Sequence, residues 1–315
     1  MVLAALFVMA PAPLRIEVKP YGMWPKAIHA VSEELEIVFV PEVGRLMHLA
    51  PPGGKNWLWE SPRADGKPLN TGGWQNWGGD KLWPAPQSLW GWPPDPALDG
   101  SPMTYQINAD GFSVFGKPSA KSGLVFERTF QVVPGSARVQ IVNRMRNTGT
   151  KAQKLAVWQI CQLDAPDRVW ISSTKFRPYP GKATPTVYFS LVPGKEQVEI
   201  LRDPYDGRKY GAKGLAGELV AFRGAERLVM RHEVDVNREY PDSDRAQQVY
   251  TNPEPHHYVE LELNSPLKTL LPGETQTLKT ALEYARTGEK EKMRRRRKES
   301  ETRLREALAR SGALQ

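Results

Sequence analysis

The sequence predicts an all-β fold, and three observations support this prediction. The apolar residues fall in short segments that are rich in β-branched and aromatic side chains and often alternate with polar ones. Turn signals separate these segments, and the chain holds 28 Pro and 26 Gly spread along its length. No segment before about residue 285 repeats its apolar side chains with the 3.6-residue period of a helix. Many strands in one uninterrupted run favour a sandwich of antiparallel sheets.

The predicted strands follow one another through the body of the chain. The clearest of them cover residues 36–40, 124–133, 137–145, 155–161, 219–222 and 258–263. Turns are predicted at 133–136, 147–150, 192–195 and 271–274, and the first two lie between successive strands at hairpin spacing. We therefore expect residues 15–285 to form one β domain without an internal repeat.

Only the C-terminal segment, residues 286–315, has the character of a helix. Between 289 and 309 it contains strong helix formers, neither Pro nor Gly, and sparse apolar positions. Its first half is basic, with a run of five cations at 294–298. Such a helix could pack on the sandwich, contact acidic lipid or be solvated, and we favour packing with a solvated polar face.

The first 14 residues have the outline of a secretory signal or its remnant. An uncharged apolar run is followed by Ala10, Pro11 and Ala12, which resembles a small-residue cleavage site. The run lacks a basic start, and Pro13 would follow the cut; a mis-assigned start that clips a longer signal would explain both. The alternative is a partly buried N-terminal strand. A periplasmic or extracellular location is therefore favoured over the cytoplasm.

Net charge and cysteine content limit the classes of partner and site that we expect. The net charge is +8, but the five cations at 294–298 supply most of it, so the remaining residues are close to neutral. We therefore expect no nucleic-acid partner. No other segment approaches the ~20 apolar residues of a membrane helix, so no integral membrane segment is expected. The single Cys161 excludes an intramolecular disulfide and a four-Cys metal site. No metal or cofactor motif is found, and the oligomeric state is left open.

A Trp-rich segment is the strongest candidate for a ligand-lining loop. Seven of the ten Trp lie between positions 57 and 92, and residues 76–87 combine Gly78-Gly79, two Pro, Lys81 and two indoles. Flat apolar rings beside polar donors suit a sugar, whose C–H faces are apolar and whose edges carry hydroxyls. The alternative is a Trp-rich corner of the core.

The order of several motifs resembles the galactose mutarotase-like superfamily. The motifs are residues 43–46, 56–60, 78–84, 158–163, 258–263 and 271–274. The resemblance covers about residues 15–285, and it is closest to an uncharacterised domain family within the superfamily, which also shares landmarks similar to 240–241 and 250–252. It implies an antiparallel β-supersandwich with one sugar-binding cleft across the concave face of a large sheet.

The resemblance also implies a catalytic pair. Mutarotases open and reclose an aldose ring: a Glu takes the proton from the anomeric hydroxyl, and an acid, usually His, protonates the ring oxygen. Glu260 stands where the base is expected, with Glu262 close behind, and the period of two in a strand puts both on one side. The alternative is that both face solvent on an outer sheet.

The expected acid is missing, because Trp158 occupies the position of the His. His257 could share a strand end with Glu260, although a lone His is more often structural, and Lys81 could supply a donor if its pKa were lowered. The residues that we expect to bind a saccharide are Asn76, Lys81, Trp83, Trp158, Gln162 and Glu262.

Two functions therefore remain open. The first is a carbohydrate-binding protein with a mutarotase-like cleft that lacks efficient epimerase chemistry, and Trp158 favours it. The second is an aldose 1-epimerase-like enzyme, an isomerase, that uses Glu260 as base with a substituted acid.

Overall fold

The computed structural model describes residues 13–62, 69–71, 73–172, 177–178, 189–193, 196–214 and 216–286. The expected leader lies outside these described residues except for its last two positions, and so does the expected C-terminal helix except for residue 286. No helix among the described residues is long and apolar enough to cross a membrane.

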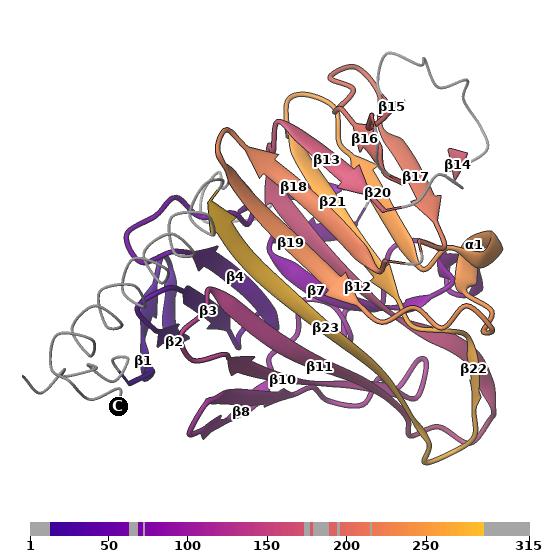
Figure 1. Cartoon of the computed structure of the whole chain (residues 1–315). Helices are drawn as coiled ribbons and strands as arrows, with labels where there is room; N and C mark the ends of the chain where they lie inside the picture. The colour runs from indigo at the N-terminus through magenta and orange to yellow at the C-terminus, as the bar shows by residue number, and fades with distance from the viewer. Residues whose placement is uncertain are drawn as a thin grey trace, which may run out of the picture.

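Two large antiparallel sheets make up the protein, which confirms the predicted β-supersandwich (Figure 1). The first sheet has 11 strands in the spatial order β1 (Arg15–Tyr21), β2 (Trp24–Val31), β3 (Glu36–Val40), β4 (Arg45–Ala50), β7 (Asp80–Ala85), β12 (Gln153–Asp164), β21 (Tyr258–Asn264), β20 (Gln247–Thr251), β17 (Arg208–Ala212) and β14 (Arg177–Pro178), with β22 (Lys268–Leu270) beside β12.

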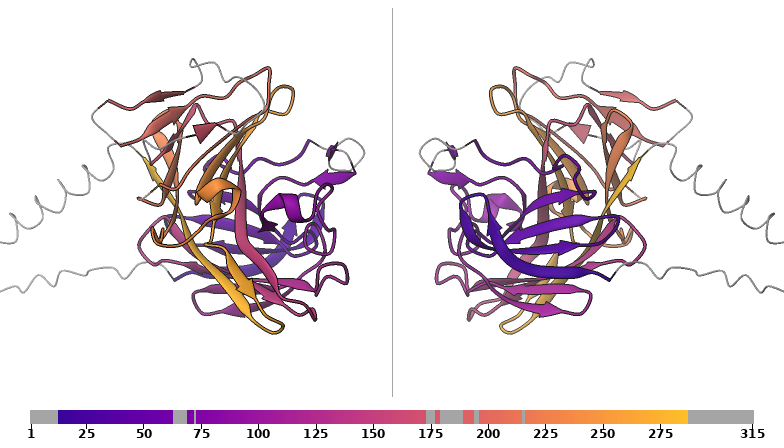
Figure 2. Two further views of the ribbon diagram at one scale, coloured as in Figure 1. Left: turned by 90° about the vertical axis from the view of Figure 1, so that its right-hand side faces the viewer. Right: turned by 90° about the vertical axis from the view of Figure 1, so that its left-hand side faces the viewer.

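The second sheet has 10 strands, in the order β15 (Phe189–Leu191), β16 (Val198–Ile200), β13 (Arg168–Ile171), β18 (Glu218–Arg223), β19 (Glu226–His232), β23 (Thr275–Arg286), β11 (Arg138–Asn147), β10 (Leu124–Val132), β9 (Gly111–Phe115) and β8 (Thr104–Asn108). Three short elements complete the described part: a hairpin of β5 (Leu69–Thr71) and β6 (Trp74–Asn76), the 3-10 turn η1 (Gln87–Leu89) and the single turn α1 (Pro241–Asp244). In Figure 2 the early strands β1 to β4 and the late strands β17 to β20 lie on opposite sides of the molecule.

The main core lies between the two sheets, because successive side chains of each strand point to opposite faces. On β12, Cys161 is buried in one cluster with Ile141 and other side chains of the second sheet. Trp158 and Ile160 of the same strand belong to a different apolar cluster, on the opposite face. The inner face of the first sheet therefore contributes to the core, and its outer face can carry a binding site.

A buried polar network ties the middle of the first sheet to the second. Asp80 of β7 forms an ion pair with Arg128 of β10, and both side chains are almost fully buried. The Arg128 Nε donates to Asn143 Oδ1 at 2.8 Å, and the Gln159 Nε2 donates to Asp80 Oδ2 at 2.7 Å. Paired and hydrogen-bonded charges of this kind tolerate burial. The network holds β7 in place, and the residue after Asp80, Lys81, therefore points to the outer face.

Strand register brings distant residues together on that outer face. Lys81 lies opposite Ile160, and Ile160 lies opposite Glu262 on its other side. Glu260 lies between Gln162 and Tyr250. We call this surface the carboxylate face and define it by Lys81, Trp158, Gln162, Glu260 and Glu262.

Candidate functional site

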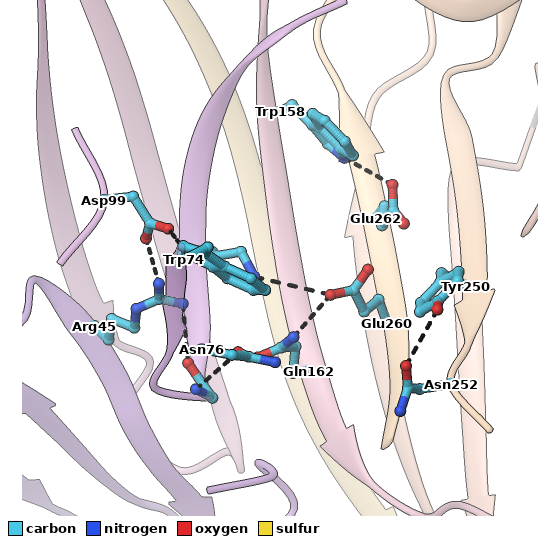
Figure 3. A network of polar contacts seen from close by, with 12 residues as sticks. Arg45, Trp74, Asn76, Asp99, Trp158, Gln162, Tyr250, Asn252, Glu260 and Glu262 are labelled. Carbon is cyan, nitrogen blue, oxygen red and sulfur yellow. Dashed lines mark hydrogen bonds and ion pairs between the residues drawn. The ribbon is translucent and has the colours of Figure 1, made fainter. Parts of the chain in front are cut away.

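Glu260 is the partly open centre of the carboxylate face (Figure 3). Its side chain is 14% exposed, whereas the other four side chains that define the face are almost completely buried. The Gln162 Nε2 donates to Glu260 Oε1 at 2.8 Å, and the Lys81 Nζ lies 3.8 Å from the same oxygen. The second oxygen of Glu260 is therefore the one available to a ligand.

Lys81 is a buried cation held between two indoles. Its Nζ lies 4.6 Å from the ring centroid of Trp74 and 4.6 Å from that of Trp83, and its side chain is 2% exposed. Burial lowers the pKa of Lys81 from 10.5 to about 8, against the opposing effect of the Glu260 carboxylate. A substantial fraction of Lys81 is thus neutral in mildly alkaline solution.

A second layer of contacts fixes the indole of Trp74. Its Nε1 donates to Asp99, which is also ion-paired with the buried Arg45. Arg45 Nη1 in turn donates to the carbonyl oxygen of Gly78 at 3.1 Å. These contacts therefore fix the position of the Trp74 ring relative to the loop before β7.

The two glycines of this loop are required by backbone packing. Both have positive φ, 88° at Gly78 and 72° at Gly79. A Cβ at Gly78 would lie 2.2 Å from the carbonyl oxygen of Trp59, and one at Gly79 would lie 2.3 Å from that of Leu46. Both glycines are thus required where the loop packs closely against neighbouring backbone.

Glu262 is a fully buried carboxyl with both of its donors on one oxygen. Trp158 Nε1 donates to Glu262 Oε2 at 2.8 Å, and Lys209 Nζ lies 2.9 Å from the same oxygen. Burial nevertheless raises the pKa of Glu262 to about 7, because the loss of solvation outweighs the attraction of Lys209. Lys209 also lies over the Trp158 ring, 4.4 Å from its centroid.

Two tyrosines lie near Glu260, Tyr250 on β20 and Tyr258 on β21. Tyr250 lies directly opposite Glu260 on β20 and donates its hydroxyl to Asn252 Oδ1 at 3.1 Å. Tyr258 packs on Trp59 with 4.6 Å between ring centroids. Burial raises the pKa of both phenols, so they remain neutral donors and acceptors at physiological pH.

Several buried polar atoms around this face make no hydrogen bond to another described residue. They include Trp83 Nε1, Gln162 Oε1 and Glu262 Oε1, while Lys81 Nζ has only its ion pair with Glu260. An unsatisfied buried polar atom costs about 1–3 kcal/mol. A ligand at Glu260 could bond to these atoms only where the side chains that cover them move.

Comparison with known proteins identifies the fold. No model of a known protein family matches the sequence, and no curated protein matches it in sequence. Solved structures do match. A galactose mutarotase-like protein from Clostridium acetobutylicum aligns with a TM-score of 0.56 and 12% identity, over 87% of this chain and 99% of that chain. The galactose mutarotase related enzyme from Lactobacillus acidophilus aligns with a TM-score of 0.57 and 9% identity, over 83% and 98%. The chain has the galactose mutarotase-like fold.

The galactose mutarotase-like fold also occurs within a longer neighbour. A TPR-domain containing protein from Parabacteroides distasonis aligns with a TM-score of 0.57 and 15% identity over 82% of this chain, and the match spans 47% of that protein. The closer likeness to an uncharacterised domain family stays a prediction.

Within the galactose mutarotase-like fold, the structure brings most of the expected residues together. Lys81, Trp158, Gln162, Glu260 and Glu262 share one face, as strand alternation predicts. The neighbours that sequence reasoning missed are Trp74, Lys209, Tyr250 and Tyr258. Tyr250 and Tyr258 stand in motifs that already supported the resemblance, but Lys209 carries no local signal, because only strand pairing places β17 beside β20.

Three expected residues have different surroundings. Trp83 is 6% exposed and packs edge-to-face against four indoles, those of Trp74, Trp90, Trp92 and Trp158. A sugar would reach its ring only if one of them moved. Asn76 Oδ1 accepts from the Gly78 N–H at 3.3 Å and so shapes the loop. The His257 side chain is 49% exposed and pairs with Glu254 at 3.3 Å. Among the described residues, no hydrogen bond or ion pair links His257 or Glu254 to Glu260.

No group of three or more His, Cys, Asp or Glu among the residues that the structure describes could hold a metal ion. The chemistry that the face can perform without a metal is hydrogen bonding and proton transfer by Lys81, Glu260 and Glu262.

Proposed function

We propose that the carboxylate face binds a saccharide and that the protein is a carbohydrate-binding protein with slow or absent epimerase activity. The observation that carries this proposal is the partly exposed carboxylate of Glu260, which Gln162 and Lys81 hold by one oxygen and which Tyr250 faces on the next strand. A sugar hydroxyl both donates and accepts hydrogen bonds, so it can donate to the other oxygen of Glu260. The fold shared with galactose mutarotase-like proteins supports the same ligand class.

The charges of the face favour a neutral sugar. Lys81 is paired with Glu260, and Lys209 is paired with Glu262. Neither cation is left over to balance a phosphate or carboxylate on the ligand. We expect modest affinity, because a sugar hydroxyl exchanges bonds to water for bonds to protein with little net gain.

The case against efficient epimerase chemistry rests on Trp158. An indole N–H does not titrate usefully, and this one already donates to Glu262 at 2.8 Å. A positioned acid or base contributes roughly 10²- to 10⁴-fold each to such a reaction. A protein that has only Glu260 in position therefore loses most of the acceleration.

One observation supports an aldose 1-epimerase-like enzyme as the second candidate. Lys81 has a pKa of about 8 and lies 3.8 Å from Glu260, so it could act as the substituted acid. Glu260 would take the proton of the anomeric hydroxyl, the C1–O5 bond would break, and Lys81 would protonate O5. Rotation about C1–C2 and reversal of the two proton transfers would give the other anomer.

Calorimetric titration with neutral aldoses and oligosaccharides tests binding, with Glu260→Gln and Lys81→Met as site variants. The matched control is Lys279→Met, an exposed lysine on β23 of the second sheet. We expect both site variants to weaken binding at least tenfold and the control to leave it unchanged. Equal affinity in all four proteins would remove the carboxylate face from saccharide binding.

Polarimetry on freshly dissolved α-D-glucose and α-D-galactose separates the two candidates. The binding function predicts a rate close to the uncatalysed one. A rate far above it that is lost in Glu260→Gln and in Lys81→Met, but not in Lys279→Met, would establish the enzyme with Lys81 as its acid.

A further inference from the structure

A cavity lies beside Trp83 and Trp90, outside the carboxylate face. Its volume is about 410 Å³, within the usual range for small-molecule pockets. None of the five residues that define the carboxylate face lines it. Its main apolar walls are Trp83, Leu89, Trp90, Leu98, Leu124 and Leu155.

The cavity lies where β12 extends beyond the end of its neighbour β7. β7 ends at Ala85, which lies opposite Ala156, so residues 153–155 of β12 have no β7 partner on that side. The chain leaves the sheet at Pro86, forms η1 and passes over this uncovered end. Leu124 and Leu155 are buried at the base of the cavity, whereas Leu89 is 64% exposed at its edge.

Most polar groups of the lining already have partners in the protein; Trp83 Nε1 makes no hydrogen bond to another described residue. Trp90 Nε1 donates to the carbonyl oxygen of Pro84 at 2.8 Å. Gln153 Nε2 donates to the carbonyl oxygen of Ser122 at 2.9 Å, and Asp95 accepts from Ser119 and from the Ala97 N–H. The walls therefore offer mostly carbon, and a ligand gains from the cavity chiefly by burying apolar surface.

The two indoles of the lining determine the shape of that ligand. The rings of Trp83 and Trp90 are 5.5 Å apart and inclined at 79°. Trp83 is almost fully buried, whereas Trp90 is partly exposed, so a planar ring in the cavity would stack on Trp90. A dry cavity of about 150 Å³ holds a benzene molecule. A cavity of about 410 Å³ therefore has room for two or three rings.

We propose that this cavity is a second binding site, which takes a planar apolar group of two or three rings. The group belongs either to a free aromatic compound or to an aromatic substituent on a saccharide. The proposal goes beyond saccharide binding and does not require it, because the cavity and the carboxylate face share no defining residue.

The test uses 1-naphthol and 8-anilino-1-naphthalenesulfonate as probes, with tryptophan-sensitised probe fluorescence as the readout. Lys121 in the lining suits the sulfonate, whereas Lys154 is already paired with Glu239 at 2.6 Å, and the neutral naphthol shows whether the charge is needed. The key variant is Leu89→Asp, which places a carboxylate at the edge without disturbing a buried side chain. Its control is Leu191→Asp, since Leu191 is similarly exposed at 66% and lies outside the lining.

We expect saturable binding of both probes to the wild type, a Kd at least tenfold higher for Leu89→Asp, and an unchanged Kd for Leu191→Asp. Near-UV circular dichroism confirms that all three proteins are folded. No saturable binding to the wild type, or equal binding to both variants, would overturn the proposal.

Three further ligands distinguish the source of the ring: 2-naphthol, 2-naphthyl β-D-glucoside and methyl β-D-glucoside. Tighter binding of the naphthyl glucoside than of naphthol, with the gain lost in Lys81→Met, assigns the cavity to the substituent of a saccharide. Equal binding of both naphthyl compounds assigns it to a free aromatic compound. If naphthol binds and methyl glucoside does not, the saccharide proposal fails for glucosides while the cavity proposal stands.

Discussion

Replacement of Lys81 by Met is expected to stabilise the protein near neutral pH while it weakens ligand binding. The Lys81 side chain is 2% exposed, and burial lowers the pKa of its ammonium group from 10.5 to about 8. Met has similar length and volume, and it carries no charge that must be desolvated. A buried cation with such a cost to folding fits a role in ligand binding.

The magnitude follows from the pKa and from the two rings around the ammonium. A lowering from 10.5 to about 8 disfavours the charged form by about 3 kcal/mol. Loss of the cation–π contacts with Trp74 and Trp83 offsets roughly 1–2 kcal/mol of this gain. Glu260 loses its cation but keeps the Gln162 hydrogen bond and some contact with water. We expect a net stabilisation of about 1–2 kcal/mol at pH 7.

The pH dependence of the stability difference between Lys81→Met and the wild type is a sharper test. Below pH 8 Lys81 is protonated in both the folded and the unfolded state, so its unfavourable contribution is fully present. Between pH 8 and 10.5 the folded protein releases this proton while the unfolded chain still holds it, and the wild type gains stability. The advantage of Lys81→Met must therefore shrink as the pH rises from 7 to 10.

Urea unfolding of the wild type, Lys81→Met and Lys279→Met at pH 7 and pH 10 provides the measurement. The exposed Lys279→Met control should stay within about 0.5 kcal/mol of the wild type at both values. If Lys81→Met were less stable than the wild type at pH 7 by more than 1 kcal/mol, and equally so at pH 10, the ammonium would be a structural group and the reasoning would be refuted.

Three other substitutions test separate parts of the structure. Arg128→Met should destabilise the protein by about 3–5 kcal/mol in urea unfolding, because it leaves the carboxylate of Asp80 buried without its cation. Ser243→Gly should raise the unfolding free energy by about 1 kcal/mol, because Ser243 has φ 64° in the left-handed region, and an unchanged Tm would contradict this. Glu262→Gln should stabilise the protein more at pH 8 than at pH 5, because folding raises the pKa of Glu262 from 4.5 to about 7. An equal gain at pH 5 and pH 8 would show that Glu262 is charged in the folded protein at both pH values.

Local sequence patterns are sufficient to predict the strands and the side to which their residues point. Alternating apolar side chains and Pro-Gly turns act over a few residues, so they predict β21 and its shared face for Glu260 and Glu262. The order of several motifs predicted the galactose mutarotase-like fold in spite of low sequence identity to its members.

Which residues meet, and how strongly their pKa values are shifted, depends on the tertiary structure. Lys81, Gln162 and Glu260 come together because β7, β12 and β21 are neighbours in the sheet, and Lys209 joins them through the pairing of β17 with β20. Strand pairing over such separations leaves no short-range pattern in the sequence. The lowered pKa of Lys81 depends on burial by residues from several strands and loops. The cavity beside Trp83 likewise depends on where β7 stops relative to β12, because packing of the whole sheet determines which surfaces remain uncovered.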